Sequence, residues 1–202
     1  MKRLVLFDLD GVLLHSRENM RQAWEVVLQK TAVKRPFEDY FALIGRPFKD
    51  IMAHLEVTHD VERIEKIYMT ASFDFLSQAT FFPGVRETLV QLRDRGVKMG
   101  VVTSKDTART KAVLTQLDIR FATVQSPNDR LRGKPAPDHV LMAMAEAGED
   151  PADTLLVGDM ETDWQAARRA GVDYVHAGWG YGKPIESVHT LHSILELPDI
   201  IL

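Results

Sequence analysis

The chain has 202 residues, of which 45% are hydrophobic and 27% charged, and its formal net charge is −4. This composition is typical of a globular protein, and the scattered basic residues give no reason to expect nucleic acid or a membrane as a partner. The absence of cysteine excludes disulfides, zinc–thiolate sites and cysteine nucleophiles. No apolar stretch is long enough to cross a bilayer or reads as a signal peptide, so we expect a cytoplasmic protein. We also expect it to be a monomer or a homodimer.

The first part of the chain predicts one strand followed by a helical block. A short apolar run over residues 3–7 is typical of a buried strand that ends at Asp8. Helical patterns follow from about Glu18 to Ala79, including one over 47–55 and another over 61–76. Pro83-Gly84 then marks the end of this block.

Strand-like and helical segments alternate in the remainder of the chain. Strands are predicted over 98–103, 121–125, 153–158 and 172–177, and helices over 85–95, 107–117, 137–147 and 163–170. Such alternation is typical of right-handed βαβ units that build a parallel sheet. We therefore expect an α/β fold, a Rossmann-like parallel sheet core flanked by helices. Its residues are 1–14 and 80–202, and an all-helical insert, residues 15–79, follows the first strand.

Polar residues follow three of the predicted strands. Asp8 and Asp10 follow the first, Thr103 ends the strand over 98–103 and is followed by Ser104, and Asp159 follows the strand over 153–158. In open α/β sheets, reactive groups gather beyond the carboxyl ends of the strands. Three acids at the ends of buried strands are unfavourable through repulsion and desolvation, and a bound cation would offset both.

The segment Asp8-Leu9-Asp10-Gly11 suggests phosphate chemistry. Its two carboxylates would converge if the strand ended in a tight turn, which Gly11 permits. One could attack phosphorus while the other moved a proton, with Mg²⁺ supplying the positive charge that a phosphate dianion requires. Taken alone, the segment is equally compatible with a solvated strand end.

Two further segments fit the same chemistry. Asp163, four residues after Asp159, could hold a ligand water or support a neighbouring group, or simply cap the helix that follows. Lys134, between a glycine and a proline, could neutralise both phosphate and carboxylates, or lie in an ordinary surface loop.

Thr103 and Ser104 offer hydroxyl and backbone N–H groups before a predicted helix, as a phosphate site would. Their alternative is an ordinary helix cap. Four segments with compatible roles at the ends of different strands are harder to dismiss than any one of them.

Together these segments resemble the four sequence motifs of the haloacid dehalogenase-like hydrolase superfamily. The matching residues are Asp8-Leu9-Asp10-Gly11, Thr103, Lys134-Pro135 and Gly158-Asp159-x-x-x-Asp163, in order along essentially the whole chain. The helical insert resembles the cap domain of the phosphoglycolate phosphatase and β-phosphoglucomutase group, so residues 15–79 are expected to form a small cap domain.

The resemblance implies specific roles. Asp8 would be the nucleophile and a metal ligand, and Asp10 the acid–base group with its backbone carbonyl on the metal. Thr103, with Ser104, and Lys134 would bind phosphate, and Asp159 would complete the ligands of Mg²⁺, with Asp163 in support. Related dehalogenases lack a proton donor at the position of Asp10, so its presence favours phosphoryl transfer, in which the alkoxide leaving group needs a proton.

Substrate choice is expected to depend on the insert. Gly45, Arg46 and Lys49 form a turn and helix start at which Arg46 and Lys49 could meet an anionic substrate, or be plain solvated charges. Lys105, beside Thr103, could likewise contact substrate or lie on the surface.

The function expected is hydrolysis of a small phosphorylated metabolite, such as phosphoglycolate, a sugar phosphate or a nucleotide. A phosphomutase with the same nucleophile is the alternative among enzymes. A non-catalytic phospho-acceptor or binding module is a further alternative, although such a module would not need Asp10 or a 60-residue insert.

Overall fold

The computed structural model describes residues 2–201, and the chain forms two compact units. The first unit contains the segment up to Leu14 and the segment from Phe81 onward, and the second contains His15–Thr80. The chain passes between them at β2 (Leu14–His15) and β3 (Thr80–Phe81), which pair in a two-stranded sheet.

The first unit is built on a six-stranded sheet in which every neighbouring pair is parallel. The strand order is β5-β4-β1-β6-β7-β8. Their bounds are β1 Leu4–Phe7, β4 Lys98–Val102, β5 Thr123–Gln125, β6 Thr154–Gly158, β7 Asp173–Ala177 and β8 Thr190–Leu191. The predicted parallel α/β fold is therefore confirmed, and only the two-residue strand β8 has no counterpart in the sequence pattern.

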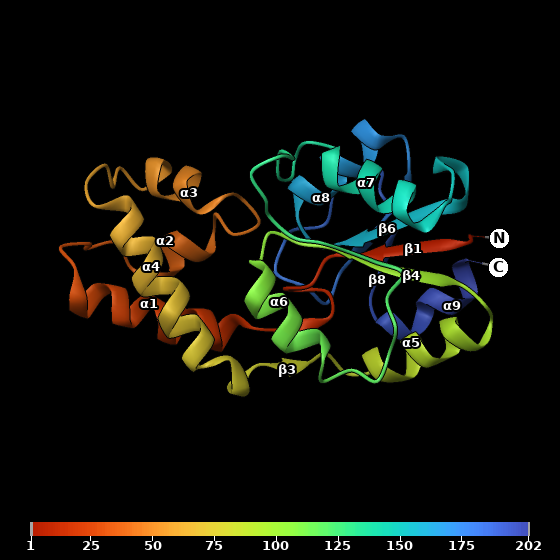
Figure 1. Ribbon diagram of the computed structural model, residues 1–202, viewed down its shortest axis with the longest axis horizontal. Helices are drawn as coiled ribbons and strands as arrows, with labels where there is room; N and C mark the ends of the chain where they lie inside the picture. Colours follow the sequence, from red (N-terminus) through yellow and green to blue (C-terminus); the bar gives the residue numbers. More distant parts are fainter. Residues whose placement is uncertain (1, 202) are drawn as a thin grey trace. The chain divides into compact units, whose positions relative to one another are not determined.

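Helices cover both faces of this sheet (Figure 1). The helices α5 (Val85–Asp94), α6 (Thr107–Leu114) and α9 (Leu197–Ile200) lie on one side, and α7 (Asp138–Ala147) and α8 (Glu161–Ala170) on the other. The central strand β1 is buried along its whole length, as expected for a strand with helices on both faces. One core layer contains Leu4, Leu6, Val140, Ala143, Leu156 and Ala166.

The order of the strands identifies where a ligand site is expected. From β1 the chain proceeds to β4 and β5 on one side, and then returns to β6 and β7 on the other side. Adjacent crossovers thus leave β1 in opposite directions, and ligands of such folds bind beyond the carboxyl end of the strand at this switch point. Asp8 is the first residue after β1.

The second unit consists of helices. They are α1 (Arg17–Lys30), α2 (Phe37–Phe41), α3 (Phe48–His54), α4 (Val61–Asp74) and the 3₁₀ turn η1 (Leu76–Gln78). The helices α1 and α4 are joined by buried hydrogen bonds, because Asn19 Nδ2 donates to the Ser72 carbonyl at 2.9 Å and Ser72 Oγ donates to Asn19 Oδ1 at 3.0 Å. Trp24 stacks on Tyr40 with ring centroids 4.4 Å apart. That this unit acts as a cap remains a prediction.

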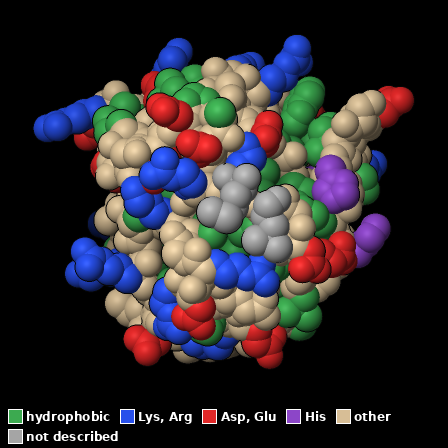
Figure 2. Space-filling model, turned by 90° about the vertical axis from the view of Figure 1, so that its right-hand side faces the viewer, with side chains coloured by type: hydrophobic (Ala, Val, Ile, Leu, Met, Phe, Trp, Pro, Cys, Tyr) green, Lys and Arg blue, Asp and Glu red, His purple; other side chains and the backbone are tan. Residues whose placement is uncertain are grey.

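Positively and negatively charged side chains are mixed on the face of the protein from which β1 starts. Figure 2 shows Lys and Arg side chains interspersed with Asp and Glu there. Within residues 2–201, no helix combines the length and the hydropathy that crossing a bilayer requires.

Candidate active site

Asp8 is followed by a tight turn, which begins directly after β1. The backbone N–H groups of Leu13 and Leu14 both donate to the Leu9 carbonyl, at 3.0 and 2.7 Å. Gly11 has φ of +91°, and a Cβ atom there would lie 2.2 Å from Asp159 Oδ2. Both the left-handed backbone and the close approach require glycine, which confirms the turn predicted from Asp8-Leu9-Asp10-Gly11.

The side chain of Lys134 is buried at the centre of the site. Its Nζ atom lies 2.6 Å from Asp163 Oδ1 and 2.8 Å from Asp8 Oδ1, and donates to the Val102 carbonyl at 3.1 Å. Burial alone would lower the pKa of Lys134, but Asp163 and Asp8 outweigh burial and raise the pKa above its ordinary value. Lys134 is therefore a fixed cation in contact with two carboxylates, and not a surface-loop lysine.

Asp163 lies in the first turn of α8 rather than at the position that caps the helix. The helix begins at Glu161, two residues earlier than predicted, so Asp163 is its third residue. Its Oδ2 atom accepts a hydrogen bond from the Met160 backbone N–H at 3.0 Å, while Oδ1 contacts Lys134. Both oxygens of Asp163 thus contact groups of the chain itself, Oδ2 through a hydrogen bond and Oδ1 through an ion pair alone.

Asp159, the first residue after β6, is completely buried. Its Oδ2 atom accepts a hydrogen bond from the Tyr181 backbone N–H at 2.7 Å. Its Oδ1 atom accepts no hydrogen bond from any described residue. A buried carboxylate oxygen without a partner is costly, so this atom points to a ligand that can interact with it.

The loop Gly178–Gly182, which follows β7, encloses Asp159. A Cβ atom on Gly180 would lie 2.3 Å from Asp159 Cβ, and one on Gly182 would lie 1.8 Å from the Asp159 carbonyl oxygen. Trp179 Nε1 donates to the Val12 carbonyl at 3.0 Å, so the loop also contacts the turn after β1. Sequence reasoning missed this loop, although three glycines alternating directly after a strand were an available signal.

Thr103 is buried at the end of β4, and its hydroxyl accepts a hydrogen bond from the Lys105 backbone N–H at 3.1 Å. The following helix, α6, begins at Thr107 and is capped by Asp106, which accepts from the Arg109 N–H at 3.1 Å. The alternative in which Thr103 or Ser104 caps this helix is therefore wrong, because Asp106 takes that role. Their predicted phosphate contacts remain predictions.

Lys105 is buried, and its Nζ atom lies 3.1 Å from Asp10 Oδ2. Burial lowers the pKa of Lys105, while Asp10 acts in the opposite direction. The alternative that placed Lys105 on the surface is wrong, because the side chain turns inward to Asp10.

The three cap candidates belong to the second unit. Gly45 has φ of +86°, Arg46 is exposed, and Lys49 pairs with Glu62 at 3.1 Å.

The site is short of positive charge. Four aspartates, at positions 8, 10, 159 and 163, face two lysines, at positions 105 and 134. Burial is the main cause that raises the pKa of Asp8 from 3.8 to about 7; Lys134 acts against it, and Asp163 adds to it. The pKa of Asp159 is also raised well above its ordinary value, first by burial and then by the charges of Asp163 and Asp8. The cluster therefore favours either protons or an additional cation.

The donor set fits a hard divalent cation. Asp8, Asp159 and Asp163 each offer one oxygen, and these three oxygens lie within 4.8 Å of one another. Carboxylate oxygens are the ligands that Mg²⁺ prefers. Since both oxygens of Asp163 are occupied, Asp8 and the free Oδ1 of Asp159 are the better candidates for direct ligation.

Comparisons with known proteins identify a family for the chain. The family model described as haloacid dehalogenase-like hydrolase matches residues 5–177. A phosphoglycolate phosphatase of Pseudomonas putida is 32% identical over 93% of this chain and 74% of its own length. The pyrophosphatase PpaX of Oceanobacillus iheyensis is 28% identical over 98% of this chain and 95% of its own length.

Solved structures show the same fold. The crystal structure of a Lactobacillus plantarum protein, named as a candidate phosphoglycolate phosphatase, superimposes with a TM-score of 0.91 at 22% identity, covering 99% of this chain and 100% of that chain. The predicted resemblance is thus confirmed by a family model that spans most of the sequence and all four motifs. The chain belongs to the family of haloacid dehalogenase-like hydrolases.

Proposed function

We propose that this protein is a Mg²⁺-dependent phosphatase that hydrolyses a small phosphate monoester through an aspartyl-phosphate on Asp8. One observation carries the proposal. A buried ammonium, that of Lys134, contacts Asp8 at the switch point of the sheet, beside a carboxylate oxygen of Asp159 that accepts no hydrogen bond from residues 2–201. The cluster thus combines a nucleophile, a fixed cation and a carboxylate oxygen that could bind a metal ion.

The chemistry assigned to the chain's own residues has two steps. The Asp8 carboxylate attacks phosphorus, the bond from phosphorus to the ester oxygen breaks, and that oxygen receives a proton from Asp10. Asp10 then removes a proton from water, which attacks the aspartyl-phosphate, releases inorganic phosphate and regenerates Asp8. Covalent catalysis of this kind replaces one difficult displacement by two easier ones.

The remaining residues supply binding and charge. Lys134 balances charge on Asp8 and on the phosphate, and the Thr103 hydroxyl, with Ser104, holds phosphate oxygens. Mg²⁺ would be held by Asp8, Asp159 and the Asp10 backbone carbonyl, with Asp163 fixing Lys134 in place. When bound, the ion offsets the repulsion between the Asp8 carboxylate and a phosphate dianion. Most of the acceleration is then electrostatic stabilisation in a site that is already organised.

The names of the relatives indicate which substrates to test first. A protein named phosphoglycolate phosphatase is 32% identical to this chain, so phosphoglycolate is the first ester to test. Pyrophosphate is the second, because a relative named as a pyrophosphatase matches almost the whole chain. We further propose that the second unit is the cap domain and that Gly45, Arg46 and Lys49 on it influence substrate choice.

The direct test is phosphate release from phosphoglycolate, pyrophosphate, sugar phosphates, nucleotides and an aryl phosphate, measured with Mg²⁺ and with EDTA. We expect Mg²⁺-dependent turnover that is lost in Asp8→Asn and in Asp10→Asn. Asp118→Asn, which changes an exposed aspartate outside the cluster, is the matched control and should retain activity. Acid-quenched wild-type enzyme should carry one phosphoryl group on the peptide that contains Asp8.

The same experiment separates the alternatives. Net conversion of glucose 1-phosphate to glucose 6-phosphate without phosphate release would identify a mutase. A stable phosphoprotein without turnover would identify a phospho-acceptor module, and rapid turnover of any ester would exclude it.

A further inference from the structure

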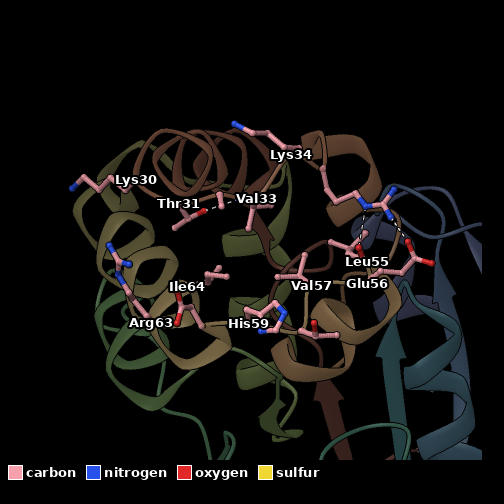
Figure 3. Close-up of a pocket in the computed structure, with 14 residues that line it drawn as sticks. Lys30, Thr31, Val33, Lys34, Leu55, Glu56, Val57, His59, Arg63 and Ile64 are labelled. Carbon is pink, nitrogen blue, oxygen red and sulfur yellow. Dashed lines mark hydrogen bonds and ion pairs between the residues drawn. The ribbon is translucent and has the colours of Figure 1, made fainter.

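The second unit contains a pocket of about 530 Å³ that none of the roles above uses (Figure 3). Its lining residues come from two segments, 30–35 at the end of α1 and 55–64 from the end of α3 into α4. No residue of the aspartate cluster or of the turn at Gly45–Lys49 lines it. Its volume lies within the usual range of pockets for small molecules.

The pocket has an apolar floor. Val33, Leu55 and Ile64 are buried, and Val57 is half-buried. In Figure 3 the side chains of Val33, Val57 and Ile64 lie toward the middle of the view, whereas Lys30, Lys34 and Arg63 lie at its margin. A ligand would therefore place an apolar body against the floor.

The margin of the pocket is cationic, although the chain as a whole has a net charge of −4. Four Lys and Arg side chains line the pocket, against the two carboxylates Glu56 and Asp60. Glu56 is already engaged, because Arg35 Nη2 contacts its Oε2 atom at 2.6 Å. Lys30, Lys34 and Arg63 are exposed and form no ion pair with the residues that the structure describes.

Apart from the Arg35–Glu56 pair, three cations and one carboxylate, Asp60, line the pocket, so its excess charge is positive and a bound anionic group would balance it. Solvent screening is the alternative, and it suffices for a single exposed lysine on a convex surface. A concave site with an apolar floor excludes part of that solvent, which strengthens attraction to a bound anion.

The walls of the pocket are fixed by the chain itself. Arg35 Nε donates to the Leu55 carbonyl at 2.9 Å, and Trp24 Nε1 donates to the Arg35 carbonyl at 2.9 Å. These bonds tie the segment 30–35 both to the end of α3 and to the buried aromatic cluster of the unit. A pocket whose walls are already ordered loses little conformational entropy when a ligand binds.

We propose that this pocket binds a small organic anion, an aryl or branched-aliphatic carboxylate or phosphate. The apolar body would lie on Val33, Val57 and Ile64, and the anionic group would lie among Lys30, Lys34 and Arg63. The proposal does not depend on the phosphatase activity, because it rests on a separate set of residues.

The test uses the full chain, free of metal, and the anionic aromatic dye 8-anilinonaphthalene-1-sulfonate as probe. Fluorescence titration measures its affinity, and amide chemical shifts in ¹H–¹⁵N NMR spectra locate it. We expect saturable binding with shifts concentrated in residues 30–35 and 55–64. The double variant Lys34→Gln/Arg63→Gln should bind the dye about tenfold more weakly, as the loss of two charged contacts implies.

The controls separate charge from general stickiness. Lys66→Gln removes an exposed cation of the same helix, α4, that does not line the pocket, and it should leave the affinity unchanged. Phenyl phosphate or phenylacetate should displace the dye, whereas neutral benzyl alcohol should not. Whichever of the two anions displaces the dye at the lower concentration identifies the anionic group that the pocket prefers.

Three results would overturn the proposal. The first is a dye affinity in the folded double variant equal to that of the wild type. The second is amide chemical-shift changes that map outside residues 30–35 and 55–64. The third is displacement of the dye by benzyl alcohol as effectively as by phenyl phosphate or phenylacetate. Circular dichroism of each variant establishes that the protein is folded.

Discussion

The Lys105 ammonium lies 3.1 Å from Oδ2 of Asp10, in a pair in which only 2% of the lysine side chain and 16% of the aspartate side chain are exposed. A pair this well buried holds its partners in a defined orientation, unlike a mobile surface ion pair. Since we assign Asp10 the proton transfer, Lys105 is expected to act as its positioning residue.

Replacement of Lys105 by Met should therefore lower kcat about 10- to 100-fold with little change in KM, because a misplaced acid–base group affects the transition state more than substrate binding. Lys105→Arg should recover part of the activity. Steady-state kinetics with the best ester of the panel measure both constants.

A substrate contact by Lys105 predicts a different result, namely a raised KM with kcat preserved. The control is Lys111→Met, which alters an exposed lysine on α6 and should leave both constants unchanged. Unaltered kinetics in folded Lys105→Met would exclude both roles.

The raised pKa of Asp8 predicts how the stability of the metal-free protein depends on pH. Burial raises this pKa from 3.8 to about 7. Between about pH 4 and pH 7 the folded chain therefore retains a proton that the unfolded chain has already released. The stability that this group contributes is therefore complete below about pH 4 and is lost as the pH rises through 7.

In EDTA at pH 8, Asp8→Asn should thus melt a few degrees Celsius higher than the wild type, since the variant buries no charge there. The two melting temperatures should converge toward pH 4. Mg²⁺ should raise the melting temperature of the wild type and not that of Asp8→Asn. Differential scanning calorimetry across this pH range measures each effect, and equal curves for the two proteins would refute the assignment of Asp8.

The parts of the fold that the sequence predicted are those determined by local pattern. The apolar run of β1, the alternation of strands and helices, and the glycines that end α7 and α8 all have short-range causes. The same holds for Asp8 and Asp159, because the carboxyl ends of the adjacent parallel strands β1 and β6 lie at the same edge of the sheet. Resemblance to a known family added the roles of these residues.

What the sequence did not predict depends on contacts between distant segments. The pairing of Lys105 with Asp10 joins residues of different loops, and the contact of Tyr181 with Asp159 spans two strand ends. Trp179 and Tyr181 lie in a loop whose glycines decide how closely it approaches Asp159. Such contacts leave little trace in periodicity or composition.

The prediction that Arg46 and Lys49 influence substrate choice can be separated from a structural role. Lys49 forms an exposed ion pair with Glu62 at 3.1 Å, and solvent screening leaves such exposed pairs little effect on stability. Arg46→Ala and Lys49→Ala should therefore leave the melting temperature nearly unchanged, but raise KM for at least one ester of the panel.

The matched control is Glu62→Gln, which removes the ion pair and keeps Lys49. If Lys49 binds substrate, Glu62→Gln should retain wild-type KM values. Identical kinetic changes in Lys49→Ala and Glu62→Gln would show that the ion pair, and not a substrate contact, is what matters.

The close approach of the loop Gly178–Gly182 to Asp159 predicts that Gly182 cannot be replaced even by alanine. A Cβ atom there would lie 1.8 Å from the Asp159 carbonyl oxygen, which is backbone and cannot rotate away. The loop would have to retreat, and the hydrogen bond from the Tyr181 N–H to Asp159 Oδ2 would lengthen or break. We expect Gly182→Ala to lower the free energy of unfolding by about 1–3 kcal/mol and to weaken Mg²⁺ binding.

Gly133→Ala is the control, because no atom lies within 4 Å of the Cβ position there and the backbone is not left-handed. This variant adjoins Lys134 yet should match the wild type in urea unfolding and in Mg²⁺ titration calorimetry. If Gly182→Ala binds Mg²⁺ as tightly as Gly133→Ala does, Asp159 does not need the loop to hold its carboxylate, and its role as a metal ligand would lose its structural support.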